Sequence, residues 1–295
     1  MTAPTRTDRL WRALARHVDR TALDLIPSQP ALRRLLDLSA RLGTALPPGT
    51  TATRDPDGTL HLRPPGTAAD APVLLYIHGG GFTLGSPRAY AALAGHLAQA
   101  AGMRAVLPAY RLAPEHPFPA ARDDVIAAHA RLLAAGTPPA ALAGDSAGGC
   151  LALLLARHLR DTGAPLPAAL GLIAPIGDLS GDIGARFAAA HDEVLIPPAW
   201  ARRIRAAYLP ATDPADPAVS PLLSDLSGLP PALIQAATGE ALAADARRLA
   251  AALDDATLDL WPGMAHVWHF HAGRSHAANT ALRRMGAFLA DKAAR

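Results

Sequence analysis

One serine in the sequence has the neighbours that a nucleophile at a sharp turn requires. Ser146 is the centre of Gly144-Asp145-Ser146-Ala147-Gly148, which has the pattern G-x-S-x-G and lies between an expected strand and an expected helix. A turn from strand to helix this tight leaves no room for side chains at the two outer glycines, and it strains the serine while exposing its hydroxyl. A chance match would seldom fall at such a junction. We therefore predict that Ser146 attacks a carbonyl carbon.

A second glycine cluster offers the backbone donors that such an attack needs. His78 is followed by Gly79, Gly80 and Gly81, after an apolar run. Three glycines together are entropically costly unless the backbone must approach a ligand. Attack on a carbonyl creates an oxyanion, and fixed N–H groups must stabilise it. We expect one from Ala147, the residue after the serine, and the others from the glycine loop, with His78 as a hydrogen-bonding support. The alternative, a phosphate-binding loop, lacks the Gly-Lys-Ser/Thr sequence that should follow.

A histidine must accept the serine proton, and a carboxylate must orient that histidine. His266 directly follows the last expected strand, in WPGMAH, and meets the chain order serine, acid, histidine. His269 and His271 come soon after, but no carboxylate or cysteine joins them at a metal-site spacing, so we expect no metal. The acid should lie in ATGEALAADA, after strand 233–237, and either Glu240 or Asp245 could serve.

The same stretches carry a family resemblance. HGGGF, YRLAPEHPFPAA, GDSAGG, SPLLSDLSGLPPALI and GMAH occur in this order between about residues 73 and 270. Together they resemble the hormone-sensitive-lipase-like branch of the α/β-hydrolases. The resemblance implies hydrolysis of carboxylic esters without a cofactor.

The resemblance also implies roles for individual residues. The triad would be Ser146, His266 and Glu240, which stands where the family usually has Asp and sometimes Glu; Asp245 remains the competitor. The oxyanion donors would be Gly80, Gly81 and Ala147. Of the YRLAPE stretch, Arg111 and Glu115 would support the oxyanion loop through buried polar contacts rather than take part in catalysis.

The hydrophobic pattern predicts an α/β fold in which a mostly parallel sheet carries helices on both faces. Short apolar strands alternate with helical segments, and TATRDPDGTLHLRPP predicts an antiparallel hairpin. The expected strands are Val73–Ile77, Arg104–Pro108, Ala140–Ala143, Leu170–Ala174, Leu233–Ala237 and Thr257–Trp261. The expected helices lie near Tyr90–Ala101, Arg122–Ala135, Ala147–Asp161, Leu242–Leu253 and Gly273–Ala294.

Two segments outside this alternation are expected to cover the site. In the first, Leu10, Leu14 and Val18 recur at the spacing of one helical face. We therefore divide the chain into an N-terminal helical cap, 1–48, and a catalytic domain, 49–295. A Pro-rich insertion near 183–221 should line the pocket. Neither segment contains a motif that specifies a substrate.

Composition narrows the function classes. The chain has 295 residues and a formal charge of only +3, without a dense basic block, so we expect no nucleic-acid partner. Cys150 is the single cysteine and can form no intramolecular disulfide. No signal peptide and no apolar run of membrane-spanning length stand out, which predicts a cytoplasmic protein without a membrane partner.

These observations together predict a serine hydrolase that cleaves small-molecule esters of short to medium acyl chain. Lactone hydrolysis, removal of acetyl groups from a secondary metabolite, acyl transfer and amide cleavage remain alternatives. A binding protein on the same scaffold would have no need of a serine, an acid and a histidine together. The oligomeric state stays open, with a homodimer among the options.

Overall fold

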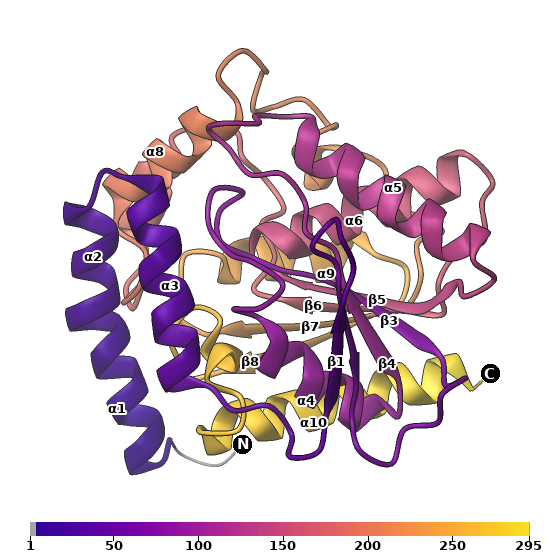
Figure 1. The fold of residues 1–295 in the computed structure, drawn as a ribbon. Coiled ribbons are helices and arrows are strands. Elements are labelled where there is room, and N and C mark those ends of the chain that lie inside the picture. Colours follow the sequence, from indigo (N-terminus) through magenta and orange to yellow (C-terminus); the bar gives the residue numbers. More distant parts are fainter. Residues whose placement is uncertain (1–3, 295) are drawn as a thin grey trace.

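A single sheet of eight strands organises the described part of the chain, residues 4–294, in the computed structural model (Figure 1). The strand order is β1-β2-β4-β3-β5-β6-β7-β8. The strands are β1 (Thr51–Arg54), β2 (Leu60–Arg63), β3 (Val73–Ile77), β4 (Arg104–Leu107), β5 (Pro139–Asp145), β6 (Ala169–Ile173), β7 (Ala232–Ala237) and β8 (Ala256–Trp261). From β4 to β8 all neighbouring strands are parallel, whereas β1 and β2 form the predicted hairpin and pair antiparallel.

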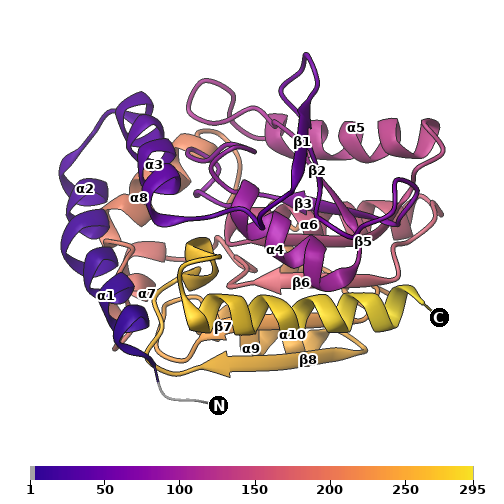
Figure 2. The ribbon, with the colours of Figure 1, turned by 60° about the horizontal axis from the view of Figure 1, so that its bottom comes forward.

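Helices cover both faces of the sheet, as the apolar strands require (Figures 1 and 2). In β3, Leu74 and Tyr76 pack on one face with α4 and α10, while Leu75 and Ile77 pack on the other with α6. The covering helices are α4 (Ala91–Ala101), α5 (Ala120–Ala134), α6 (Ala147–Asp161), α9 (Ala243–Ala252) and α10 (His276–Ala293). The predicted fold class is confirmed, and the predicted strands and helices lie within a few residues of those observed.

The remaining helices gather on one side of the molecule, and we call them the cap helices (Figures 1 and 2). They are α1 (Arg6–Leu14), the π-helical turn η1 (Ala15–Asp19), α2 (Arg20–Leu25), α3 (Gln29–Gly43), α7 (Ile183–Ala189) and α8 (Pro198–Tyr208). Ser28 caps the N-terminus of α3, where its side chain accepts a hydrogen bond from the Ala31 N–H. Short 3₁₀ turns, η2 (Pro221–Leu223) and η3 (Trp268–His271), complete the fold.

The apolar face noted on the first helix does not face the core. Leu10 and Val18 are 56% and 52% exposed, and Leu14 is also exposed. The residues of this segment that line a pocket of the molecule lie on another face of the helix and include Trp11, Ala15 and Asp19. Among residues 4–294, no helix combines the length and the hydropathy that crossing a membrane would need.

Candidate active site

Ser146 lies at the turn from β5 to α6 in a backbone conformation that side chains rarely adopt, with φ 51° and ψ −117°. The glycines of the motif are sterically required. A Cβ on Gly144 would lie 2.4 Å from the Gly148 carbonyl oxygen, and a Cβ on Gly148 would lie 2.0 Å from the Ile77 carbonyl oxygen. The strain at Ser146 is thus maintained by packing on both sides, as is common where a reactive side chain must be presented.

The glycine loop that follows β3 presents unpaired backbone donors beside this turn. Gly80 and Gly81 have φ 107° and 60°, and a Cβ on Gly80 would lie 2.3 Å from the Leu84 carbonyl oxygen. Across residues 4–294, no protein acceptor is hydrogen bonded to the N–H of Gly80, Gly81 or Ala147. Buried N–H groups are nearly always paired in folded proteins. Three free donors on the two neighbouring segments are what an oxyanion would need.

A buried carboxylate joins the two segments. Asp145 Oδ1 accepts hydrogen bonds from the Tyr76 hydroxyl at 2.8 Å and from the Gly79 N–H at 2.9 Å. Its other oxygen is buried without a partner among the described residues. Burial raises the pKa of Asp145 to about 7, against the lowering effect of these hydrogen bonds. Asp145, the residue before Ser146, therefore fixes the position of the glycine loop, a role that the sequence did not indicate.

The His78 side chain contacts the backbone of the glycine loop and stacks against aromatic side chains. Its Nδ1 lies 2.8 Å from the Gly79 carbonyl oxygen, and its ring stacks on Tyr110 at 4.2 Å between centroids. The Tyr110 hydroxyl donates to the His78 carbonyl oxygen at 2.6 Å. Burial lowers the pKa of His78 to about 4, so the ring is neutral at physiological pH. In the YRLAPE stretch it is thus the tyrosine that contacts the loop.

His266 and Glu240 form a buried pair. His266 Nδ1 lies 2.5 Å from Glu240 Oε2, and both residues are at most 6% exposed. The other oxygen of Glu240 accepts a hydrogen bond from the Ala237 N–H at the end of β7. Burial alone would lower the pKa of His266, but the charge of the facing carboxylate and the shared hydrogen bond raise it above its ordinary value. The Glu240 carboxylate therefore fixes the His266 ring and favours its protonated form.

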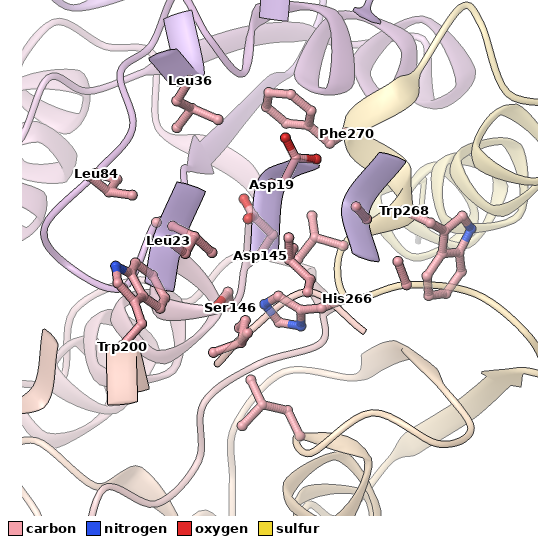
Figure 3. Close-up of a pocket in the computed structure, with 18 of the residues that line it drawn as sticks. Asp19, Leu23, Leu36, Leu84, Asp145, Ser146, Trp200, His266, Trp268 and Phe270 are labelled. Atoms are coloured by element: carbon pink, nitrogen blue, oxygen red, sulfur yellow. The ribbon is translucent and has the colours of Figure 1, made fainter. Parts of the chain in front are cut away.

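Ser146 and His266 line the same pocket, and Figure 3 shows both side chains on its wall. Within the described chain their side chains are not hydrogen bonded to each other. Catalytic hydrogen bonds are often long or poorly aligned before substrate binds, so this geometry is compatible with a proton transfer between the two.

Asp245, the other carboxylate considered for the triad, lies in a different environment. It is 1% exposed, and its Oδ2 accepts hydrogen bonds from the N–H groups of Gly177 at 2.9 Å and Asp178 at 3.2 Å. Its Oδ1 pairs with Arg186 of α7 at 3.2 Å. These bonds fix the loop after β6 and leave Asp245 without a bond to His266.

The other two histidines of the cluster point elsewhere. His269 Nε2 lies 2.9 Å from Gln235 Oε1 on β7, and the His271 ring stacks on Trp11 at 4.2 Å between centroids. No group of three His, Cys, Asp or Glu side chains suited to a metal ion forms within residues 4–294.

Arg111 and Glu115 do not make the buried contacts expected of them. Arg111 is half-exposed and pairs with Asp124 on α5. Glu115 is also half-exposed, and it reaches the loop only through Arg33 of α3, whose Nε donates to the Thr83 carbonyl oxygen at 2.8 Å. Both charges thus lie at the surface, and each pairs with a side chain on a helix, Asp124 of α5 and Arg33 of α3.

A second carboxylate, also missed from the sequence, lies near the Glu240–His266 pair. Glu193 Oε1 accepts hydrogen bonds from the N–H groups of Leu195 and Ile196, and its Oε2 accepts one from Ala241 at 3.2 Å. It therefore ties the segment between α7 and α8 to the loop that carries Glu240. Its charge also contributes to the raised pKa of His266. Nothing in the local sequence distinguishes it from an ordinary loop residue.

Around these groups the pocket wall is largely apolar. The cap helices contribute side chains from α2, α3, α7 and α8, including Leu23, Leu36, Ile183, Trp200 and Ile204. Figure 3 shows Leu23, Leu36 and Trp200 arranged around Ser146 and His266. A pocket of this kind suits an apolar ligand that is positioned by a few polar groups.

Comparisons with known proteins agree with this geometry. A family model described as the alpha/beta hydrolase fold matches residues 74–270. An acetyl-hydrolase of Streptomyces hygroscopicus is 40% identical over 269 residues, which cover 89% of each chain. A putative acetyl-hydrolase, LipR, of Mycobacterium tuberculosis is 38% identical over 269 residues, covering 87% of this chain and 86% of the relative.

Solved structures are similar over nearly the whole length. An esterase from the bacterial hormone-sensitive lipase family superimposes with a TM-score of 0.88 at 34% identity, over 99% of both chains. A mutant of the esterase E40 superimposes with a TM-score of 0.90 at 34% identity, over 98% of this chain and 99% of that one. The similarity therefore includes the cap helices as well as the sheet.

Proposed function

We propose that this chain, which belongs to the hormone-sensitive-lipase-like branch of the α/β-hydrolase family, hydrolyses carboxylic esters with Ser146 as its nucleophile. The observation that carries the proposal is the Glu240–His266 pair at 2.5 Å in the pocket that Ser146 also lines. The relatives named as acetyl-hydrolases and esterases support the choice of ester bonds over other carbonyl substrates.

In the first half of the reaction, His266 takes the proton of Ser146 while the serine oxygen attacks the ester carbonyl carbon. The negative charge that develops on the carbonyl oxygen is stabilised by the N–H groups of Gly80, Gly81 and Ala147. When the tetrahedral intermediate collapses, the ester C–O bond breaks and protonated His266 gives its proton to the leaving alcohol.

In the second half, water attacks the acyl group on Ser146, and His266 takes the water proton. The serine leaves with that proton, which frees a carboxylic acid and restores the enzyme. Glu240 stays ionised throughout and stabilises the imidazolium that forms twice in the cycle.

We further propose that the acyl group is small, with acetyl esters as the first candidates. A Cβ on Gly81 would lie 2.4 Å from Ile204 Cδ1 and 3.0 Å from Trp200 Cη2, so α8 packs directly against the glycine loop. This packing limits the room beside the expected oxyanion site. Two relatives are themselves named acetyl-hydrolases. A rate profile over 4-nitrophenyl esters of graded acyl length should peak at the short end.

The test of the nucleophile is Ser146→Ala, because alanine keeps the fold and removes only the reactive oxygen. We expect turnover to fall by about 10⁴-fold or more, as when other serine triads lose their nucleophile. The thermal midpoint should change little. A fluorophosphonate probe should label the wild type at Ser146 and fail to label the variant. Ester hydrolysis at near wild-type rate by Ser146→Ala would refute the mechanism.

A further inference from the structure

One polar side chain in the apolar pocket has no role in the mechanism above. Asp19 ends the π-helical turn η1 of the cap and lines the pocket together with Ser146 and His266. Figure 3 shows its carboxylate pointing toward the ring of Phe270, on the side where Leu36 also lies. Isolated π-helical turns within helices often occur at functional sites.

The Asp19 carboxylate has no partner. Among residues 4–294 it makes no hydrogen bond and no ion pair, and burial alone raises its pKa. The arginines of this helical segment do not pair with Asp19: Arg12 pairs with Asp192, Arg20 donates to the carbonyl oxygens of Glu193 and Ile196, and Arg16 lies exposed on η1 without a bond to Asp19. Asp19 is half-buried, and neither of its carboxylate oxygens is among the fully buried polar atoms, so the carboxylate is accessible from the pocket while apolar side chains surround much of it. Partial loss of water without a partner costs free energy, which is why polar groups in apolar surroundings are normally paired.

The binding partner that best suits this carboxylate is a cationic hydrogen-bond donor. An ionised carboxylate only accepts hydrogen bonds, and its bond to a charged donor is roughly twice as strong as one between neutral groups. Among residues 4–294 no charged donor is bonded to Asp19, so a cationic group of a bound ligand would find this carboxylate free to pair. The neighbouring pocket side chains, Leu23 and Leu36, would accommodate an aliphatic spacer.

We propose that Asp19 binds an ammonium group of the substrate, so that the preferred esters carry an amine separated from the scissile carbonyl by an apolar spacer. This inference rests on the proposed ester hydrolysis and names the substrate class for the same pocket. The cap would then recognise the substrate by one charge, while the sheet edge carries out the chemistry.

The test compares matched pairs of esters that differ only in charge. On the alcohol side, 6-(dimethylammonio)hexyl acetate is compared with 7-methyloctyl acetate, its neutral isostere. On the acyl side, 4-nitrophenyl 7-(dimethylammonio)heptanoate is compared with 4-nitrophenyl 8-methylnonanoate. A tertiary amine keeps the N–H donor and cannot itself be acylated. The proteins are the wild type, Asp19→Asn and a control, Asp24→Asn, which removes a charge from the exposed side of α2.

In at least one pair, Asp19→Asn should lower the ratio of kcat/KM for the ammonium ester over its isostere by about 10-fold or more, the range expected when a hydrogen bond between charged groups is lost. The loss should appear in KM, because binding at a distance from the reacting atoms acts on ground and transition state alike. Asp24→Asn should leave the ratio at its wild-type value. The thermal midpoint of Asp19→Asn should stay the same or rise, since the variant removes an unpaired charge.

An unchanged ratio in both pairs would overturn the proposal and leave Asp19 as a hydrated carboxylate at the pocket wall. A loss seen with 6-hydroxyhexyl acetate but not with the ammonium esters would overturn the cation in favour of a hydroxyl. Failure of the proposed function would look different, because Ser146→Ala would then retain turnover of every ester. Calorimetric titration of the ammonium esters into Ser146→Ala, with and without Asp19→Asn, measures the same discrimination without turnover.

Discussion

The pocket has two walls that are built in opposite ways. On the sheet edge, two buried carboxylates fix neighbouring groups: Asp145 holds the glycine loop, and Glu240 holds His266. On the cap side, apolar side chains dominate, and the carboxylate of Asp19 has no partner among the described residues. At the sheet edge internal hydrogen bonds position the polar side chains and leave backbone N–H groups free, whereas the cap leaves a side-chain charge unpaired.

The difference follows from what each wall must do. Groups that meet a developing charge must be oriented before the reaction, and this requires partners that prevent them from moving. Groups that recognise a substrate gain most when their partner arrives with the ligand. The sheet edge should therefore tolerate no change of partner, whereas changes in the cap should alter which substrates are used.

Among the changes that compare the two walls, the largest effect should come from Glu240→Gln. The amide keeps the size of the side chain but removes the charge that stabilises protonated His266, and we expect kcat to fall by about 10⁴-fold, as when a triad aspartate becomes asparagine. Asp245→Asn is the matched control, because Asp245 is equally buried but bonds to Gly177, Asp178 and Arg186. It should lower the free energy of unfolding by about 1–3 kcal/mol and leave kcat within a few-fold.

Steady-state kinetics and denaturant unfolding of the two variants separate these roles. If Asp245→Asn lost activity on the scale of Glu240→Gln while remaining folded, the assignment of the acid would be wrong.

The pH profile should show a smaller effect on the same wall. His266 acts as a base only when neutral, so kcat/KM should fall as the pH drops through its pKa. Because the facing Glu240 carboxylate raises that pKa above 6.5, the midpoint of the acid limb should lie above pH 6.5. Glu193→Gln removes a second negative charge that raises the pKa of His266, so it should shift the limb to lower pH.

Asp19→Asn serves as the cap counterpart in this measurement. Asp19 is not among the main causes of the raised pKa of His266, so with a neutral ester the acid limb of Asp19→Asn should nearly coincide with that of the wild type. An equal shift of the acid limb in Glu193→Gln and Asp19→Asn would show that charges on the cap affect the pKa of His266 as strongly as charges near the sheet edge.

How far the sequence predicted the site depends on the same division. The alternation of apolar strands and helices was sufficient to predict the sheet. The two glycine motifs were sufficient to predict the turn at Ser146 and the glycine loop, because the backbone geometry there permits few residue types. The sequence indicated that a carboxylate after strand 233–237 would meet His266 and favoured Glu240 while leaving Asp245 as the competitor; of the two, Glu240 is the one that lies against His266.

What the sequence did not indicate are contacts between distant segments. Tyr110 and Arg33 both reach the glycine loop, and Glu193 reaches the loop of Glu240, yet each belongs to a stretch with no fixed spacing to its partner. The first helix shows the same difficulty in another form. Its most regular apolar face, with Leu10 and Val18, is the exposed one, so periodicity alone indicated a helix but not which side lines the pocket.

The smallest effect should come from changing the contacts by which Arg33 of α3 joins the cap to the segments beside the glycine loop. Arg33 of the cap donates to the Thr83 and Ala113 carbonyl oxygens and pairs with Glu115, whose side chain is 45% exposed. Since exposed ion pairs contribute at most about 1 kcal/mol, Glu115→Gln should lower the free energy of unfolding by less than that and change kcat/KM less than about threefold. Arg33→Gln also removes donors from two backbone carbonyls, so it should cost more stability, about 1–3 kcal/mol. Thermal unfolding and kinetics of both variants provide the comparison. A tenfold fall of kcat in Glu115→Gln would mean that the cap takes part in holding the oxyanion loop for catalysis, and the two walls would then have to be treated as one.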